Sequence, residues 1–497
     1  MKRLLLALGA SLTLLLVVLI GRTLLPPSVH LSASTPALPD GIDAQRAARH
    51  LGEAIRLPSI SHQLGAAPAE LQASRAAFAG LQEWLTRRYP QFSASTERQL
   101  FGGASLLFTW TGRNPQLPAV LLMSHLDVVP VAPGTVEQWQ QPPFSGALAD
   151  GFVWGRGAID SKGSLVAMLE AAEALLSQGY QPERTVLFAF GHDEEIGGLQ
   201  GNRKIAEHLQ QQGVRLAWVA DEGGVLSQGL VPGVEANVAV VGIAEKGSVS
   251  LTLQAKAEGG HSSMPPAFAE TAIGRLSQAL QRIGQAPFAG GLQEPTASFL
   301  ASVAPAQGFA LRVAFANLWL FGPLVEQRME QSASGAAQLH TVISPTLLNA
   351  GIKENVLPQD ARAVVNLRIH PQDSIASVRE HVRAAIDDPR ISIKVLPGAR
   401  EPTPLSNING PAYRYFSQTI SDSFGNTLVA PNLTVGGTDS RYYLALTDNV
   451  FRFIPIRMTA SDLPRFHGTD ERIAIAHLAE AAGFYYRLLR NLPAQDE

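Results

Sequence analysis

Residues 185–195 read Thr-Val-Leu-Phe-Ala-Phe-Gly-His-Asp-Glu-Glu, an apolar run that ends in a cluster of acidic residues. The run at 186–190 has the length and composition of a buried strand. In an α/β protein, functional groups gather at the carboxyl ends of such strands. Two adjacent carboxylates, Glu194 and Glu195, are costly to desolvate unless a cation holds them. The pattern therefore predicts a divalent metal, with one Glu as ligand and the other as base on a water, although a solvated acidic turn has the same local sequence.

The overall composition is that of a globular protein. The 497 residues suffice for two or three domains, and 46% are hydrophobic while 16% are charged. A net charge of −3 argues against nucleic acid or an anionic membrane surface as a partner. Cysteine is absent, so any metal must be held by histidine and carboxylate side chains.

The N-terminus departs from this globular pattern. Lys2 and Arg3 precede the apolar residues 4–20, and residues 26–43 are rich in Pro, Ser and Ala, which predicts a linker. The apolar run is long for a signal peptide and only just long enough to span a bilayer. We interpret residues 1–25 as a signal-anchor, or alternatively as a cleaved signal. Basic residues before the run place the remainder of the chain outside the cytoplasm, either membrane-anchored by a single span or secreted.

Helical and strand patterns alternate through the first half of the chain. Helices are expected at 44–55, 70–88, 164–176 and 202–212, and strands at 118–123, 185–190 and 216–220. This alternation predicts an α/β fold with a mostly parallel sheet flanked by helices.

After Lys246 the pattern changes to alternating apolar and polar residues, as at Val249, Leu251 and Leu253, which is typical of a sheet with one solvated face. We predict a smaller α+β domain at 247–397, inserted into a first domain formed by 44–246 and 398–492. The apolar stretch 299–339 has no clear assignment.

Four further segments offer metal-binding side chains. In His125-Leu-Asp127, the carboxylate can accept one ring N–H and leave the other ring nitrogen for a metal. Asp160 follows a glycine-rich turn and precedes a helix, where an ordinary N-cap is the alternative interpretation. Asp221 and Glu222 are two acidic residues at the end of the strand predicted at 216–220, and His467 lies near the C-terminus. Together these segments predict a site for two metal ions.

Six motifs in this order resemble the aminoacylase/carboxypeptidase family of dinuclear zinc metallopeptidases, and most closely its carboxypeptidase S branch, which includes N-acyl-amino-acid synthase/hydrolases. They are His125-Leu-Asp127, residues 155–163, Asp193-Glu-Glu195, Asp221-Glu-Gly-Gly224, Gly260-His-Ser-Ser263 and His467-Gly. Residues 366–371 and 437–441 resemble the same branch. The resemblance implies a zinc exopeptidase-like fold, a lid or dimerisation role for the inserted domain, and a possible homodimer.

The resemblance also implies a role for each site residue. Two Zn²⁺ per chain would be bridged by Asp160. His125 and Asp221 would be the further ligands of one metal ion, with Glu222 as the alternative to Asp221. Glu195 and His467 would be the further ligands of the other. Asp127 would orient His125, and Glu194 would act as the general base. His261 would donate to the oxyanion, either from the inserted domain or, as in dimeric relatives, from the neighbouring subunit. Arg368 and Asn355 would bind the substrate carboxylate.

These roles imply a zinc-dependent amide hydrolase acting on N-acyl amino acids or small peptides with a free carboxylate. Carboxypeptidase and acylase activity need the same site, and amide synthesis is the reverse reaction. A catalytically inactive binding or scaffold protein would have lost a ligand or the base, and all are present. A dinuclear phosphohydrolase would need more basic groups near the metals.

Overall fold

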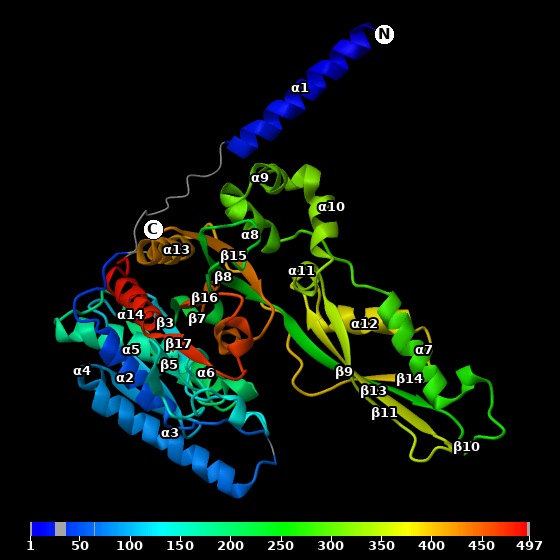
Figure 1. The fold of residues 1–497 in the computed structure, drawn as a ribbon, viewed down its shortest axis with the longest axis horizontal. Helices are drawn as coiled ribbons and strands as arrows, with labels where there is room; N and C mark the ends of the chain where they lie inside the picture. The colour runs from blue at the N-terminus through cyan, green and yellow to red at the C-terminus, as the bar shows by residue number, and fades with distance from the viewer. Residues whose placement is uncertain (1, 25–35, 64, 495–497) are drawn as a thin grey trace.

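The computed structural model describes residues 2–24, 36–63 and 65–494 (Figure 1). An α/β body carries most of the chain, and an elongated second sheet extends from it where strand β8 is followed by β9. A single helix, α1, projects from the ribbon beside α9 (Figure 1).

The body is built on an eight-stranded sheet in the order β1-β2-β6-β3-β7-β16-β8-β15. Four neighbouring pairs are parallel: β3 with β6, β3 with β7, β7 with β16, and β8 with β15. The predicted α/β class with a mostly parallel sheet is therefore confirmed. The strands span Glu97–Phe101 (β1), Ser105–Trp110 (β2), Ala119–His125 (β3), Val186–Gly191 (β6), Leu216–Ser227 (β7), Asn237–Glu245 (β8), Thr427–Thr434 (β15) and Val450–Met458 (β16).

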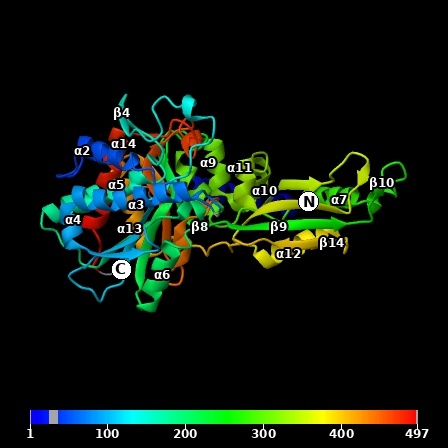
Figure 2. The same ribbon diagram turned by 90° about the horizontal axis from the view of Figure 1, so that it is seen from below.

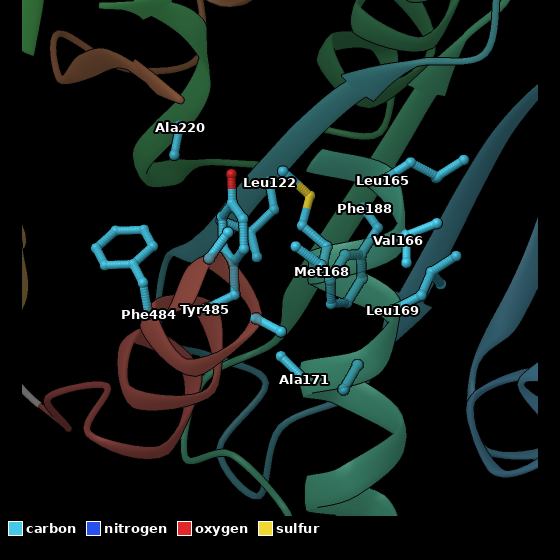
Figure 3. Close-up of a cluster of buried hydrophobic side chains, with 14 of the residues drawn as sticks. Leu122, Leu165, Val166, Met168, Leu169, Ala171, Phe188, Ala220, Phe484 and Tyr485 are labelled. Carbon is cyan, nitrogen blue, oxygen red and sulfur yellow. The ribbon is translucent and has the colours of Figure 1, made fainter. Parts of the chain in front are cut away.

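Helices cover both faces of this sheet. Because side chains alternate along a strand, Leu122 and Phe188 point to one face, where they meet Met168 of α5 and Phe484 of α14 (Figure 3). Their neighbours Leu121 and Leu187 point to the other face, which α6 covers. The helices of the body span Ala44–Ile55 (α2), Pro68–Arg88 (α3), Pro90–Ser95 (α4), Lys162–Ser177 (α5), Asn202–Gln211 (α6), Pro411–Phe424 (α13) and Ile475–Arg490 (α14).

A small three-stranded sheet lies beside the body and brings two distant segments together. It has the order β17-β5-β4, with β4 at Ala147–Ala149, β5 at Phe152–Trp154 and β17 at Arg472–Ala474. Pairing of β5 with β17 places the glycine-rich turn at 155–160 next to residues 467–471.

The second sheet is antiparallel and four-stranded, in the order β11-β13-β9-β14. Helices α7 and α12 cover one face, and β9 alternates buried and half-buried residues, as its sequence predicted. At the end of the sheet remote from the body, β10 pairs with β12 (Figure 2). The elements span Gly247–Lys256 (β9), Gly260–His261 (β10), Ala272–Gln285 (α7), Val342–Ala350 (β11), Val356–Leu357 (β12), Asp360–Ile369 (β13), Ile375–Ile386 (α12) and Ile391–Val395 (β14).

The apolar stretch without an assignment from sequence forms four short helices between α7 and β11. They are α8 (Thr296–Val303), α9 (Phe309–Ala316), α10 (Leu318–Met329) and α11 (Ala333–Leu339). Val303 of α8 packs with Leu428 and Ala430 of β15, so these helices lie at the β15 edge of the body rather than on the second sheet.

Helix α1 spans Lys2–Leu24, and its residues 3–24 are long and apolar enough to cross a membrane. A secretory signal would pass the same test. Of the predicted linker at 26–43, residues 26–35 lie outside the described part of the chain. The following residues run along the body, where Arg487 of α14 donates a hydrogen bond to the carbonyl of Ala37.

Candidate dinuclear metal site

His125 is the last residue of β3 and is 2% exposed. Its Nδ1 lies 2.9 Å from the carbonyl and 3.3 Å from the carboxylate of Asp127. Either contact draws the proton to Nδ1, so that Nε2 is free to bind a metal. Nε2 faces the carboxylates of Asp160 and Glu222, at 2.8 and 3.3 Å.

Asp127 also fixes the turn that follows strand β6. Its two carboxylate oxygens accept the backbone N–H groups of Glu194 and Glu195, at 3.2 and 3.1 Å. One buried carboxylate therefore sets both the ring of His125 and the pair of glutamates in the short helix Glu194–Ile196.

Asp160 lies between two histidines. One carboxylate oxygen is 2.8 Å from Nε2 of His125, and the other is 3.0 Å from Nε2 of His467, which lies 3.2 Å from Glu195. Burial alone would raise the pKa of Asp160, but hydrogen bonds from the two histidines outweigh it and hold that pKa below its usual value. The hydrogen bonds to Asp160 and Glu195 raise the pKa of His467 to about 10.

Glu222, rather than Asp221, presents its carboxylate to this cluster. Successive residues of a strand point to opposite sides, and Asp221 turns away to accept the backbone N–H of Ser440 at 2.8 Å. Of the two acids that the resemblance offers as a ligand beside His125, the structure places Glu222, not the expected Asp221, next to the ring. Burial, together with the nearby Asp160, raises the pKa of Glu222 to about 8, although His125 acts in the opposite direction.

The donor set fits divalent metal ions. Ligand atoms of His125, Glu194 and Glu222 lie within 4.8 Å of one another, and so do those of His125, Asp160 and Glu195. Within the described residues, Oε1 of Glu195 is buried without a hydrogen-bond partner. Four carboxylates surround two imidazoles here, and one of the carboxylates has an unsatisfied buried oxygen. Bound cations would be stabilised by these groups, whereas burying the carboxylates without cations costs free energy.

Glu194 is buried beside this cluster. Burial raises the pKa of its carboxyl well above the usual value, and the negative charges of Glu222 and Asp439 raise it further. A carboxylate in this environment has a strong tendency to take up a proton.

Glu471 is a structural residue of the site that the sequence did not assign. It is fully buried, and one of its oxygens accepts the backbone N–H groups of Gly157, Ile159 and Asp160, at 3.0, 2.9 and 3.2 Å. Its other oxygen accepts a hydrogen bond from Arg156 at 2.6 Å. Glu471 thereby positions the turn that presents Asp160. In the sequence, the one indication of this role is that Glu471 follows His467 by four residues.

A cavity of about 1040 Å³ opens onto the cluster. Glu194, Glu195, Glu222, Asp160 and His467 line it on one side. Four arginines also line it: the predicted Arg368 of β13, and Arg203, Arg400 and Arg441, which no sequence pattern indicated as substrate-binding residues.

His261 and Asn355 lie elsewhere. His261 is exposed on β10, where its Nδ1 accepts the backbone N–H of Ser263, and the carbonyl of Asn355 accepts the N–H of Ser262. The ten-residue strand β9 separates this tip from the body, a length of about 33 Å at the usual rise per residue. Arg368 pairs with Ser248 at the opposite end of the sheet, so Asn355 and Arg368 do not meet within this chain.

Comparison with known proteins agrees with this geometry. The profile of Peptidase family M20/M25/M40 matches residues 121–491. The chain is 38% identical to an N-fatty-acyl-amino acid synthase/hydrolase of Xenopus tropicalis over 88% of this chain and 84% of that protein, and 37% identical to a probable carboxypeptidase S-like protein of Dictyostelium discoideum over 83% and 79%.

Solved structures show the same fold. An M20 family metallo-carboxypeptidase from Sulfolobus solfataricus superposes with a TM-score of 0.65 at 17% identity, covering 89% of this chain and 98% of that one. Human carnosine dipeptidase 1 superposes with a TM-score of 0.61 at 14% identity, covering 92% and 99%. The chain belongs to Peptidase family M20/M25/M40, in the branch of the N-acyl-amino-acid synthase/hydrolases and carboxypeptidase S.

Proposed function

We propose that this chain, a metallo-hydrolase of amide bonds, uses two zinc ions to cleave N-acyl amino acids or small peptides that carry a free carboxylate. The observation that carries the proposal is the position of Asp160, which faces one histidine with each carboxylate oxygen. A single carboxylate shared in this way suits a bridge between two metal ions.

Each metal would have its own set of ligands around the shared Asp160. His125 and Glu222 would hold one ion, and Glu195 and His467 the other, as their mutual distances allow. The bound metals would supply an activated water nucleophile and polarise the scissile carbonyl. Asp127 would orient His125 and the glutamates without binding metal itself.

Glu194 is proposed as the general base. It would take a proton from the attacking water and deliver it to the nitrogen of the leaving amine. Burial and neighbouring carboxylates raise the pKa of Glu194, so its carboxylate is a stronger base than that of an ordinary glutamate.

Two features of the cavities suit the two halves of the substrate. Arg368 and Arg400 line the cavity above the metals and can bind the free carboxylate. A second cavity of about 410 Å³ reaches Asp160 and Glu222, and its lining is largely apolar, including Leu230, Val231, Ile454, Leu463 and Phe466. We assign this second cavity to an apolar acyl group or side chain.

The distance of His261 from the metals supports a homodimer. We propose that His261 and Asn355 of one chain reach the metal site of the second chain, where His261 would donate to the developing oxyanion. The side-chain oxygen of Asn355 is buried without a partner among the described residues, which fits a group that is satisfied on assembly.

The two sheets belong to two domains with different proposed roles. We propose residues 44–246 and 398–492 as the catalytic domain and 247–397 as the inserted lid and dimerisation domain, with α8 packed back on the catalytic sheet. We propose α1 as a single-span anchor that keeps the catalytic part outside the cytoplasm, with secretion as the outcome if it is cleaved. N-terminal sequencing of the mature protein distinguishes the two.

The test is hydrolysis by the purified full-length protein loaded with zinc. The substrates are N-acyl amino acids of increasing acyl length, dipeptides, and the carboxamide of each, and released amino acids are quantified by mass spectrometry. We expect hydrolysis of acids in preference to their amides, and its loss in Glu194→Gln. No release from any substrate by the metal-loaded wild type would favour the inactive scaffold, and net amide formation from fatty acid and amino acid would favour the synthase direction.

A further inference from the structure

The surface of α9 and α10 is apolar and exposed. Phe309, Trp319 and Leu324 are 71%, 55% and 62% exposed, and Leu311 and Leu320 are exposed beside them. Between Glu294 and Glu326, Arg312 is the only charged residue. A contiguous apolar surface of this kind on a globular body normally marks a binding site.

This surface lies against the C-terminal end of α1 (Figure 1). Arg22 of α1 donates to the carbonyl of Ala316 at 3.1 Å, and Arg312 donates to the carbonyl of Thr23 at 3.0 Å. The buried amide of Asn317 contacts the hydroxyl of Thr23 at 3.3 Å. Both arginines therefore take part in joining the two helices.

The position of these contacts along α1 sets their depth in a membrane. The 23 residues of α1 measure about 34 Å at the usual helical rise, slightly more than the hydrocarbon core of a bilayer. Thr23 and Arg22 lie in its last turn, so in a spanning α1 they reach the outer interfacial layer. The helices that contact them reach the same layer.

The geometry of α9 and α10 suits helices that lie on a membrane rather than cross it. With eight and twelve residues they measure about 12 and 18 Å, and they are bent at 114° to each other. Trp319 is the type of side chain that favours the interfacial layer. On the inner side of the pair, Phe315 packs on the body and Val325 is buried.

We propose that α9 and α10 form a membrane-docking element that inserts Phe309, Trp319, Leu320 and Leu324 into the outer leaflet beside α1. The proposal rests on the anchoring role proposed above for α1. The element also touches the wall of the apolar cavity at the metals, because Val231 lines that cavity and packs in the same cluster as Phe299 of α8 and Phe315 of α9. Docking would thus place the acyl cavity next to the lipid surface from which a long-chain acyl substrate would arrive.

The absence of cysteine allows a direct test. Leu320→Cys and Leu324→Cys, each in the full-length chain, are labelled with an environment-sensitive fluorophore and reconstituted into phosphatidylcholine nanodiscs with or without lipids that carry a quencher near the headgroup. Leu12→Cys in α1 reports whether α1 is in the bilayer. Leu100→Cys is the matched control, because Leu100 is 54% exposed on β1, at the opposite edge of the sheet from β15.

We expect blue-shifted emission and lipid quenching at positions 320, 324 and 12, and neither at position 100. Quenching at position 12 but none at 320 and 324 would overturn the docking proposal and leave the anchor standing. Quenching at 320 and 324 without quenching at 12 would support docking and contradict the anchor. Labels at 320 and 324 that are shielded from iodide yet unquenched by lipid would show a protein contact and overturn the proposal.

Discussion

Nε2 of His467 lies 3.0 Å from the carboxylate of Asp160, whose other oxygen is 2.8 Å from His125. If Asp160 bridges two metals, Asp160→Ala should lose both, whereas His467→Ala or Glu195→Ala should retain about one zinc per chain. Metal content by mass spectrometry after gel filtration measures this directly. Two full equivalents in Asp160→Ala would contradict the bridging role.

Glu222 and Asp221 can be separated by matched amide substitutions. Glu222→Gln removes the carboxylate beside His125, and we expect it to lose about one zinc and most activity. Asp221→Asn can still accept the N–H of Ser440, so it should keep both metals and fold normally. The reverse result would restore Asp221 as the ligand.

Glu194→Gln tests the general base. The substitution keeps the size of the side chain and should leave the metal content unchanged, while kcat falls by about 10²–10⁴-fold, the usual effect of removing a general base. Near wild-type turnover at full zinc occupancy would assign Glu194 another role.

Metal binding should release protons. Without metal, the pKa of His467 is raised to about 10, so its imidazole is protonated at neutral pH and must lose that proton to bind zinc. The affinity for zinc should therefore fall as the pH is lowered. Calorimetric titration of the metal-free protein in buffers of different ionisation enthalpy should show release of about one proton or more, and identical apparent enthalpies in all buffers would contradict this.

Mixing two inactive variants tests the shared site. His261→Ala keeps the metal site, and Glu194→Gln keeps His261, so a mixed dimer contains one complete site if His261 acts on the second chain. After random exchange of equal amounts, about a quarter of wild-type activity should return, since half of the dimers are mixed and each has one functional site. Each variant mixed with itself is the control, and no recovery despite proven exchange would contradict the action of His261 on the second chain.

The periodicity of apolar residues is sufficient to predict helices and strands of the body, because α2 and β6 have the apolar patterns of a buried helix face and a buried strand. It could not decide between Asp221 and Glu222, since the two point to opposite sides of β7 and only the register with β16, which shifts nearby, fixes which one faces His125. The stretch 299–339 was undecided because an apolar helix on a core and one on a membrane have the same composition. Arg400 could not be predicted because it forms an isolated bridge with Ser248 outside the regular strands, where the sequence has no periodic pattern.

Helix α1 leaves the body beside α9, at one fixed place on each chain. In a symmetric dimer the two chains are related by a half-turn, which carries each α1 onto the other. Both helices can enter the same bilayer only if the axis of that half-turn runs along the bilayer normal. Both metal sites would then stand at equal height above the lipid, and the two chains would meet while diffusing in a plane rather than in bulk solution.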